Sequence, residues 1–230
     1  DTSFVSQGAG FPDVNGSALA PFEASYAQLL ETQGREINMD VTRNVLVSKF
    51  KGDDVWLVIN KAQSPQGTSV DSFYLAATDL TPLKHIVDQP RVRIETQYTE
   101  NSVTGTMQMG GRERDINVDV SEKLLGSIDI AVMGMSLASD YQTQFSMFNL
   151  LRQQAEKRVL SITGTQTTSV PAGEFDCLVV EIDKDDGTEK QTLYVTTEKP
   201  HLLIKSVSQL PAMMGGGTAT TELVKTSLDL

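Results

Sequence analysis

The chain has 230 residues, 39% of them hydrophobic, and it carries 30 acidic against 19 basic side chains, for a formal net charge of −11. That charge repels phosphate backbones and anionic membrane surfaces, so we expect no nucleic-acid partner. No run of about 18 apolar residues occurs in the sequence, so we also expect no transmembrane helix. The length permits one sizeable core, and we expect a single antiparallel β domain over residues 21–230.

The first 20 residues are rich in Gly, Ser, Ala and Asn, which predicts a leader or linker that is partly ordered. The chain begins at Asp1 without a basic segment followed by an apolar one, so we expect any signal peptide to have been removed. Residues 22–33 fit both a helical face and a strand, and periodicity alone leaves the two open. Gly34 is expected to supply the turn that follows.

Alternation of apolar and polar residues starts at Arg35. It predicts half-buried strands at about 35–48, 55–60, 72–77, 91–98, 103–109 and 115–120. Turn residues separate them at Gly52, in the polar loop 63–69, at Asn101 and at Gly110-Gly111. Such short connections make neighbouring strands antiparallel.

The alternation breaks between Leu124 and Ser139, where apolar residues crowd together around Gly126 and Gly134. This segment is either a buried connection or short helix that covers one face of the sheet, or a mobile apolar plug over a cavity. Alternation then resumes and predicts strands at about 141–148, 155–165, 175–183, 190–196, 202–210 and 220–225.

Most of these strands are apolar on one face only, and few helices are predicted to cover that face. The sheet must therefore curl onto itself. We predict a mainly β fold, a large curved antiparallel sheet shaped as a half-barrel or clam, with few short helices. A strongly curved sheet often leaves a groove between its halves.

Motifs that carry chemistry are scarce. Cys177 is the only cysteine and its alternating position predicts a small buried hydrophobe. His85 and His201 lack the companions of a zinc site, and Asp183 to Gly187 lacks the ligand spacing of a calcium loop, so Asp185-Asp186-Gly187 is interpreted as a hairpin turn. Nucleophile, phosphate-binding and dinucleotide motifs do not occur. We expect no enzyme, no cofactor and no metal, with a hydrolase as a lesser alternative.

Three stretches carry a family resemblance: Val170-Pro171-Ala172-Gly173-Glu174-Phe175-Asp176-Cys177, Thr192-Leu193-Tyr194-Val195 and 199–205. Together they resemble a bacterial envelope family, domain of unknown function family 3108. The family is similar to the periplasmic lipoprotein carriers LolA and LolB, whose half-closed barrels hold acyl chains. The resemblance implies a strand at 22–33 and the fold of that family. It also implies a periplasmic or secreted location, and it transfers no catalytic residue.

These patterns lead us to predict a non-catalytic envelope protein that binds an apolar or lipid-like ligand in the concave face of the sheet. Alternation nominates the lining residues Val92, Ile94, Tyr98, Val103, Met107 and Met109. Met213 and Met214, beside three glycines, either contact the ligand or pack on the sheet. The alternative function is a structural or protein-interaction module with a filled core that docks another envelope protein.

Overall fold

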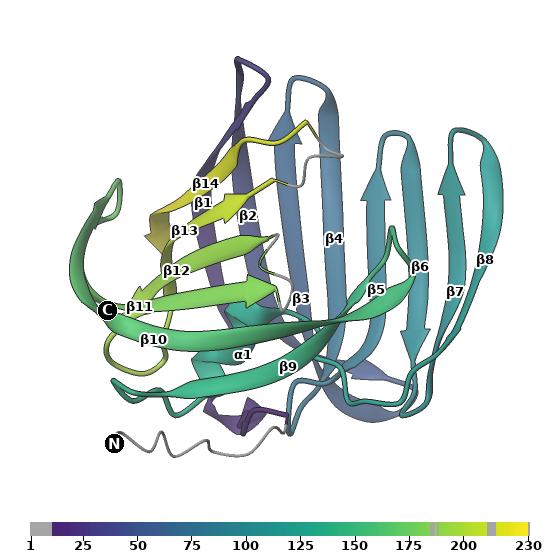
Figure 1. Cartoon of the computed structure of the whole chain (residues 1–230), viewed down its shortest axis with the longest axis horizontal. Helices are drawn as coiled ribbons and strands as arrows, with labels where there is room; N and C mark the ends of the chain where they lie inside the picture. The colour runs from purple at the N-terminus through teal and green to yellow at the C-terminus, as the bar shows by residue number, and fades with distance from the viewer. Residues whose placement is uncertain (1–10, 185–186, 188, 211–214, 230) are drawn as a thin grey trace.

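A computed structural model describes residues 11–184, 187, 189–210 and 215–229. Over these residues the chain forms one antiparallel sheet of fourteen strands, one α-helix and one short 3-10 helix (Figure 1). The strands are β1 (Phe22–Thr32), β2 (Arg35–Phe50), β3 (Asp53–Ser64), β4 (Gly67–Ala76), β5 (Pro82–Gln89), β6 (Val92–Tyr98), β7 (Ser102–Met109), β8 (Arg112–Asp119), β9 (Gln142–Asn149), β10 (Gln154–Val170), β11 (Gly173–Lys184), β12 (Lys190–Thr196), β13 (Leu203–Gln209) and β14 (Thr218–Thr226).

The strands follow one another as a meander, and β1 pairs with β14 to join the two ends of the chain. The spatial order is therefore β8 to β1 followed by β14 to β9. The edge strands β8 and β9 are not hydrogen-bonded to each other, so the sheet curves without closing. Strands β9 and β10 run across the front of β3 to β6 (Figure 1). The predicted curved antiparallel sheet is confirmed.

Turn chemistry explains why the strands pair in this register. Gly110 and Gly111 have φ angles of 59° and 78°, the left-handed values that a tight two-residue hairpin turn requires. The polar loop predicted at 63–69 is much shorter, because β3 and β4 continue to Ser64 and from Gly67. Strand β5 was not predicted, since its inward-facing His85 interrupts the apolar alternation.

The described part of the expected leader, residues 11–20, packs against the sheet. Val14 and Leu19 are buried on either side of the 3-10 helix η1 (Gly16–Ala18). The indole nitrogen Nε1 of Trp56 donates a hydrogen bond to the carbonyl oxygen of Gly16 at 3.0 Å. Trp56 is therefore a core residue.

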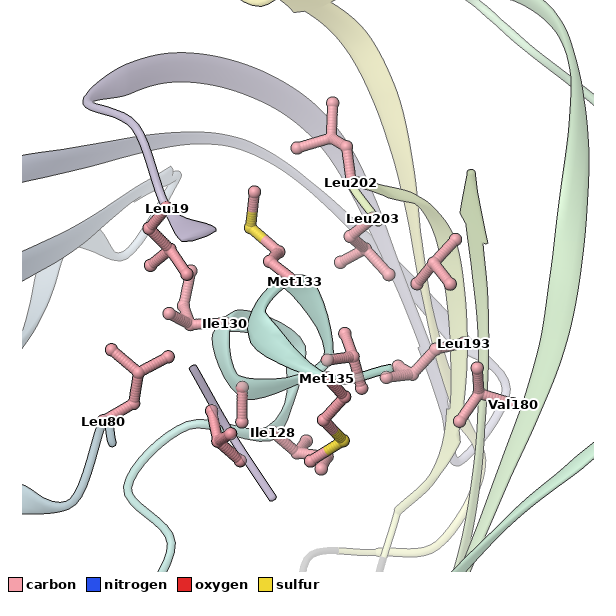
Figure 2. Packing of buried hydrophobic residues seen from close by; sticks show 14 of the residues in the cluster. Leu19, Leu80, Ile128, Ile130, Met133, Met135, Val180, Leu193, Leu202 and Leu203 are labelled. Carbon is pink, nitrogen blue, oxygen red and sulfur yellow. The ribbon is translucent and has the colours of Figure 1, made fainter. Parts of the chain in front are cut away.

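The helix α1 (Ile128–Gly134) lies in the connection between β8 and β9, inside the curved sheet. Figure 2 shows it end on, with Leu19 and Leu80 on one side and Leu193 and Val180 on the other. Ile130 and Met133 are almost fully buried in this cluster. The prediction of a short buried helix over the sheet is confirmed. No described helix is long and apolar enough to cross a membrane.

Candidate functional site

The inward-facing residues change character along the strands of the sheet. On β13, Leu203 and Ile204 are buried in the core, whereas Ser206 and Ser208 further along line a cavity. The same change from large apolar to small or polar residues occurs on three more strands: Val58, Asn60 and Ala62 on β3, Phe73, Asp71 and Ser69 on β4, and Leu223, Thr221 and Ala219 on β14. On β1 the inward residues are Tyr26, Gln28 and then the apolar Leu30. Over the described residues, the interior thus has an apolar end packed around α1 and a polar end that no helix fills.

The polar end contains a cavity of about 500 Å³, called here the polar cavity. Uncharged hydrogen-bonding side chains supply much of its wall: Gln28, Asn60, Ser69, Gln89, Gln191, Ser206, Ser208 and Thr221. Apolar residues such as Leu30, Met39 and Val41 line the remainder. Gln28 donates a hydrogen bond to Thr221 at 2.9 Å, from Nε2 to Oγ1.

An ion pair forms the border between the polar cavity and α1. Arg43 on β2 contacts Asp129 through Nη2 and donates from Nε to Asn60 Oδ1 at 2.7 Å. Its guanidinium lies 5.5 Å from the centre of the Tyr26 ring. Ser127, just before the helix, donates to Asp129 Oδ1 at 2.5 Å. The pair therefore ties the helix to the sheet.

Burial and charge shift the titration of these groups. Burial alone would raise the pKa of Asp129, but the charge of Arg43 and the hydrogen bonds from Ser127 and Arg43 outweigh it and hold the pKa below its ordinary value. Burial raises the pKa of Tyr26 to about 12. At neutral pH the border is therefore one ion pair beside a neutral phenol.

A second cavity, called here the aromatic cavity, has a volume of about 390 Å³. It lies between β4 to β6 and the β9–β10 hairpin, and its apolar lining consists of Phe73, Tyr98, Leu125, Ile128, Met147, Phe148, Leu150, Leu151 and Ile182. Tyr98 and Phe148 meet edge to face, with ring centres 6.2 Å apart. This contact brings the tip of the hairpin onto β6. Burial also raises the pKa of Tyr98 to about 12.

The two cavities adjoin, because Gln191 and Ser208 line both. Between them, His85 lies in the aromatic lining and Asp71 in the polar one, and His85 Nε2 is 2.9 Å from Asp71 Oδ1. The imidazole also stacks on Phe73 at 3.8 Å between ring centres. A ligand with unlike halves would therefore find an apolar and a polar compartment side by side.

Charged residues at the other side of the aromatic cavity are paired with one another. Glu156, buried on β10, accepts from Arg152 Nη1 at 2.8 Å, and Glu189 accepts from Arg158 Nη2 at 2.9 Å. Burial opposes ionisation of Glu156, but hydrogen bonds from Asn149 and Arg152 and the charge of Lys184 lower its pKa. This network favours the ionised form of Glu156 beside an apolar surface.

The structure places the sequence-predicted lining residues in different surroundings. Tyr98 lines the aromatic cavity. Ile94, Val103 and Met107 belong to a separate buried cluster that also contains Leu124. The partly buried residues Val92 and Phe148 pack against this cluster. Met109 is 51% exposed. Met213 and Met214 lie outside the described residues.

The other singled-out residues have structural surroundings. Cys177 is fully buried and burial raises the pKa of its thiol, as expected for a small core hydrophobe. His201 donates or accepts through Nδ1 at 2.9 Å from the carbonyl oxygen of Thr196. Within the described ranges, no group of three or more His, Cys, Asp or Glu residues could hold a metal ion. Of the predicted turn at Asp185-Asp186-Gly187, the structure describes only Gly187, with φ of 68°.

The polar wall was missed by sequence reasoning, although a signal for it exists. Ser206, Ser208 and Thr221 occupy the inward positions of strands whose other inward residues are apolar. A hydroxyl at an inward position is costly to bury unless it meets water, a ligand or a partner. Polar residues at such positions therefore indicate an unfilled interior.

A family model described as "Protein of unknown function (DUF3108)" matches residues 22–224. The chain belongs to this family. The match confirms the resemblance predicted from the stretches around Cys177, Tyr194 and Lys205. No curated protein matches the sequence of this DUF3108 chain.

One of the solved structures compared shares the fold of this DUF3108 protein. It is similar to a beta-barrel-like protein of domain of unknown function DUF1849 from Brucella abortus, at 10% identity and a TM-score of 0.54, over 94% of this chain and 98% of that chain. It is also matched by a protein described as exported, with a YmcC-like fold, from Bacteroides fragilis (10% identity, TM-score 0.36, 96% and 99% covered). A protein described as a lipoprotein from Parabacteroides distasonis matches at 11% identity and a TM-score of 0.39, with 96% and 100% covered. The Brucella protein supports a barrel-like fold for this chain and nothing further.

Proposed function

We propose that this protein is a non-catalytic binding protein that holds a lipid-like, amphiphilic ligand inside its curved sheet. The observation that carries the proposal is the pair of adjoining cavities, one lined by aromatic and aliphatic side chains and one by hydroxyl and amide groups. Both volumes lie within the range of roughly 300–1,000 Å³ that is typical of small-molecule sites.

The aromatic cavity suits the apolar part of such a ligand. Each methylene group moved from water into an apolar site contributes about 0.8 kcal/mol, so a chain of several methylenes binds without any specific polar contact. Leu151, in the turn between β9 and β10, lines this cavity and is 55% exposed. The cavity thus reaches the protein surface at this turn, where a chain can enter.

The interior favours ligand binding over the alternative of a structural or protein-interaction module. That alternative expects a filled core together with a large apolar patch outside. Exposed large hydrophobic residues are instead spread over β2, β7, the β9–β10 turn and β14, namely Leu46, Val47, Met109, Leu151 and Val224. The unfilled space lies inside the sheet.

The proposal includes a functional relation to the LolA and LolB carriers and a periplasmic or secreted location. Its support is the resemblance of the stretch around Cys177 and the half-closed shape of the sheet. Fractionation of cells that express the full-length gene product tests the location, and recovery in the cytoplasm alone would contradict it.

Titration with a fluorescent alkyl probe tests ligand binding. We expect a saturable one-to-one complex with the wild-type protein, and binding at least tenfold weaker in Met147→Trp, because the larger side chain fills the aromatic cavity. The matched control is Met109→Trp, which adds the same side chain at an exposed position outside both cavities. The proposal fails if the wild-type protein binds no alkyl probe, or if both variants bind it like the wild type.

A further inference from the structure

We infer that the ligand's polar part is uncharged, a headgroup rich in hydroxyl or amide groups, and that it occupies the polar cavity. This inference rests on the proposed function and adds the chemical class of the ligand. Two observations carry it: the pairing of every described charged side chain that lines the cavities, and the polar side chains facing the polar cavity that have no hydrogen-bond partner among the described residues.

The first observation concerns charge. Among the described residues that line the polar cavity, the charged ones are Arg43, Asp129 and Asp71, and they are engaged by one another or by His85. In the aromatic cavity, Glu156 and Glu189 contact Arg158, and Lys190 contacts Glu181 at 2.9 Å.

An ionic headgroup gains little from such a lining. A charged group that leaves water needs a counter-charge or several hydrogen bonds to offset the loss of hydration. Here the counter-charges already belong to ion pairs of the protein. A neutral headgroup avoids this cost, because hydroxyl and amide groups lose far less on leaving water.

The second observation concerns hydrogen bonds. Ser206 is only 8% exposed, and its hydroxyl has no hydrogen-bond partner in the described part of the chain. Further lining side chains share this property, and they come from three other strands as well as from β13: Ser69, Gln89, Gln191 and Ser208. Ser69, Gln191 and Ser208 are half-buried and Gln89 is exposed, so these groups face the cavity with hydrogen-bonding capacity that water or a ligand can satisfy.

The positions of these groups fit a ligand that spans both cavities. Gln191 and Ser208 line both cavities and so lie where the apolar chain would join its headgroup. Ser69 and Gln89, on β4 and β5, form the facing wall of the polar cavity. A headgroup with two or more donors and acceptors would therefore reach hydrogen-bonding groups on opposite sides.

Displacement of a bound fluorescent alkyl probe tests the inference with three ligands that share a twelve-carbon chain: monolauroylglycerol, dodecanol and laurate, at pH 8. We expect monolauroylglycerol to bind about tenfold tighter than dodecanol, since one or two additional neutral hydrogen bonds contribute about 0.5–1.5 kcal/mol each. Laurate, ionised at this pH, should bind more weakly than monolauroylglycerol. Equal or tighter binding of laurate, or equal binding of the two neutral ligands, overturns the inference.

Variants of the polar wall locate the headgroup. The double variant Ser206→Ala with Ser208→Ala should weaken monolauroylglycerol binding about five- to tenfold and leave dodecanol binding within twofold. Ser161→Ala, on the outward face of β10, is the control. If the double variant does not fold, Gln191→Leu repeats the test from β12. Unchanged monolauroylglycerol binding in these variants overturns the inference, whereas failure of the wild type to bind all three ligands overturns the proposed function itself.

Discussion

The two ends of the interior use the same strands and the same alternation but differ in what fills them. At the apolar end, α1 places Ile130 on the side of Leu19 and Leu80, and the side chains there are almost fully buried. At the polar end no helix of the described residues enters, and Ser206 and Ser208 face a cavity instead. Among the described residues, the interior is therefore packed where the connection between β8 and β9 turns inward.

This difference separates stability from function within one sheet. Large apolar side chains in contact with one another stabilise the fold, and their loss leaves a void. Small polar side chains around a cavity contribute little to the fold but can satisfy a bound molecule. The ion pair of Arg43 and Asp129 lies where the two ends meet.

The largest expected effect is at this border. Arg43→Met would leave the buried carboxylate of Asp129 without its counter-charge, and we expect the free energy of unfolding to fall by about 3–5 kcal/mol. Urea denaturation measures it. Arg93→Met removes an exposed arginine that pairs with Asp88 and should cost no more than about 1 kcal/mol. A similar small loss at Arg43 would show that Asp129 reaches water.

The loss in free energy of unfolding on side-chain truncation should differ several-fold between the apolar end and the polar end. Ile130→Ala, in α1, should reduce the free energy of unfolding by about 2–5 kcal/mol, because it creates a cavity in a packed core. Met39→Ala, at the wall of the polar cavity, should cost less than about 1 kcal/mol, since its neighbours are not packed around it. Equal losses in denaturant titrations would mean that the ends are packed alike.

Removal of a hydroxyl group should likewise reduce stability more where the hydroxyl has protein partners than where it faces the polar cavity. Thr196 Oγ1 donates to the carbonyl oxygen of Pro200 at 2.9 Å and accepts from the amide of Leu202 at 3.0 Å, so Thr196→Val should cost about 1–3 kcal/mol. Ser208 has no such partner among the described residues, and Ser208→Ala should change stability by less than about 0.5 kcal/mol. Thermal unfolding distinguishes the two, and a large loss at Ser208 would point to a hidden structural role.

The smallest expected effect is the pH dependence that Asp129 gives to the free energy of unfolding. The folded-state pKa of Asp129 lies below its ordinary value of 3.8, so its contribution is fully present above about pH 4 and is lost as the pH falls through the folded-state value. The slope from one carboxyl cannot exceed about 1.4 kcal/mol per pH unit. Asp129→Asn should therefore show a flatter decline between pH 6 and pH 3 than the wild type, and identical slopes would contradict an ionised Asp129.

The sheet could be predicted from sequence because alternation and turn residues act locally. Gly110-Gly111 marks its hairpin by conformation alone, and the apolar run after Leu124 indicated a buried helix or connection. Strand β5 escaped because His85, an inward residue, is polar and is satisfied by Asp71 on the neighbouring strand. That partnership depends on tertiary structure.

The site was harder to predict, since alternation identifies inward positions but not what covers them. Ile94, Val103 and Met107 do face inward, yet Phe148 and Leu124 come from distant parts of the chain to pack over them. The positions left uncovered depend on where α1 lies. The inward residues Ser206, Ser208 and Thr221 carry a local signal of the polar cavity.

A crystal structure of the protein soaked with 12-bromododecanol tests the central claim most directly, because the bromine marks the end of the alkyl chain by its anomalous signal. We expect one bromine in the aromatic cavity, beside Phe73 and Phe148, with the alcohol directed towards Ser208. A bromine bound only on the outer surface, or an aromatic cavity filled by its own side chains, would contradict the claim that the unfilled part of this sheet holds a ligand.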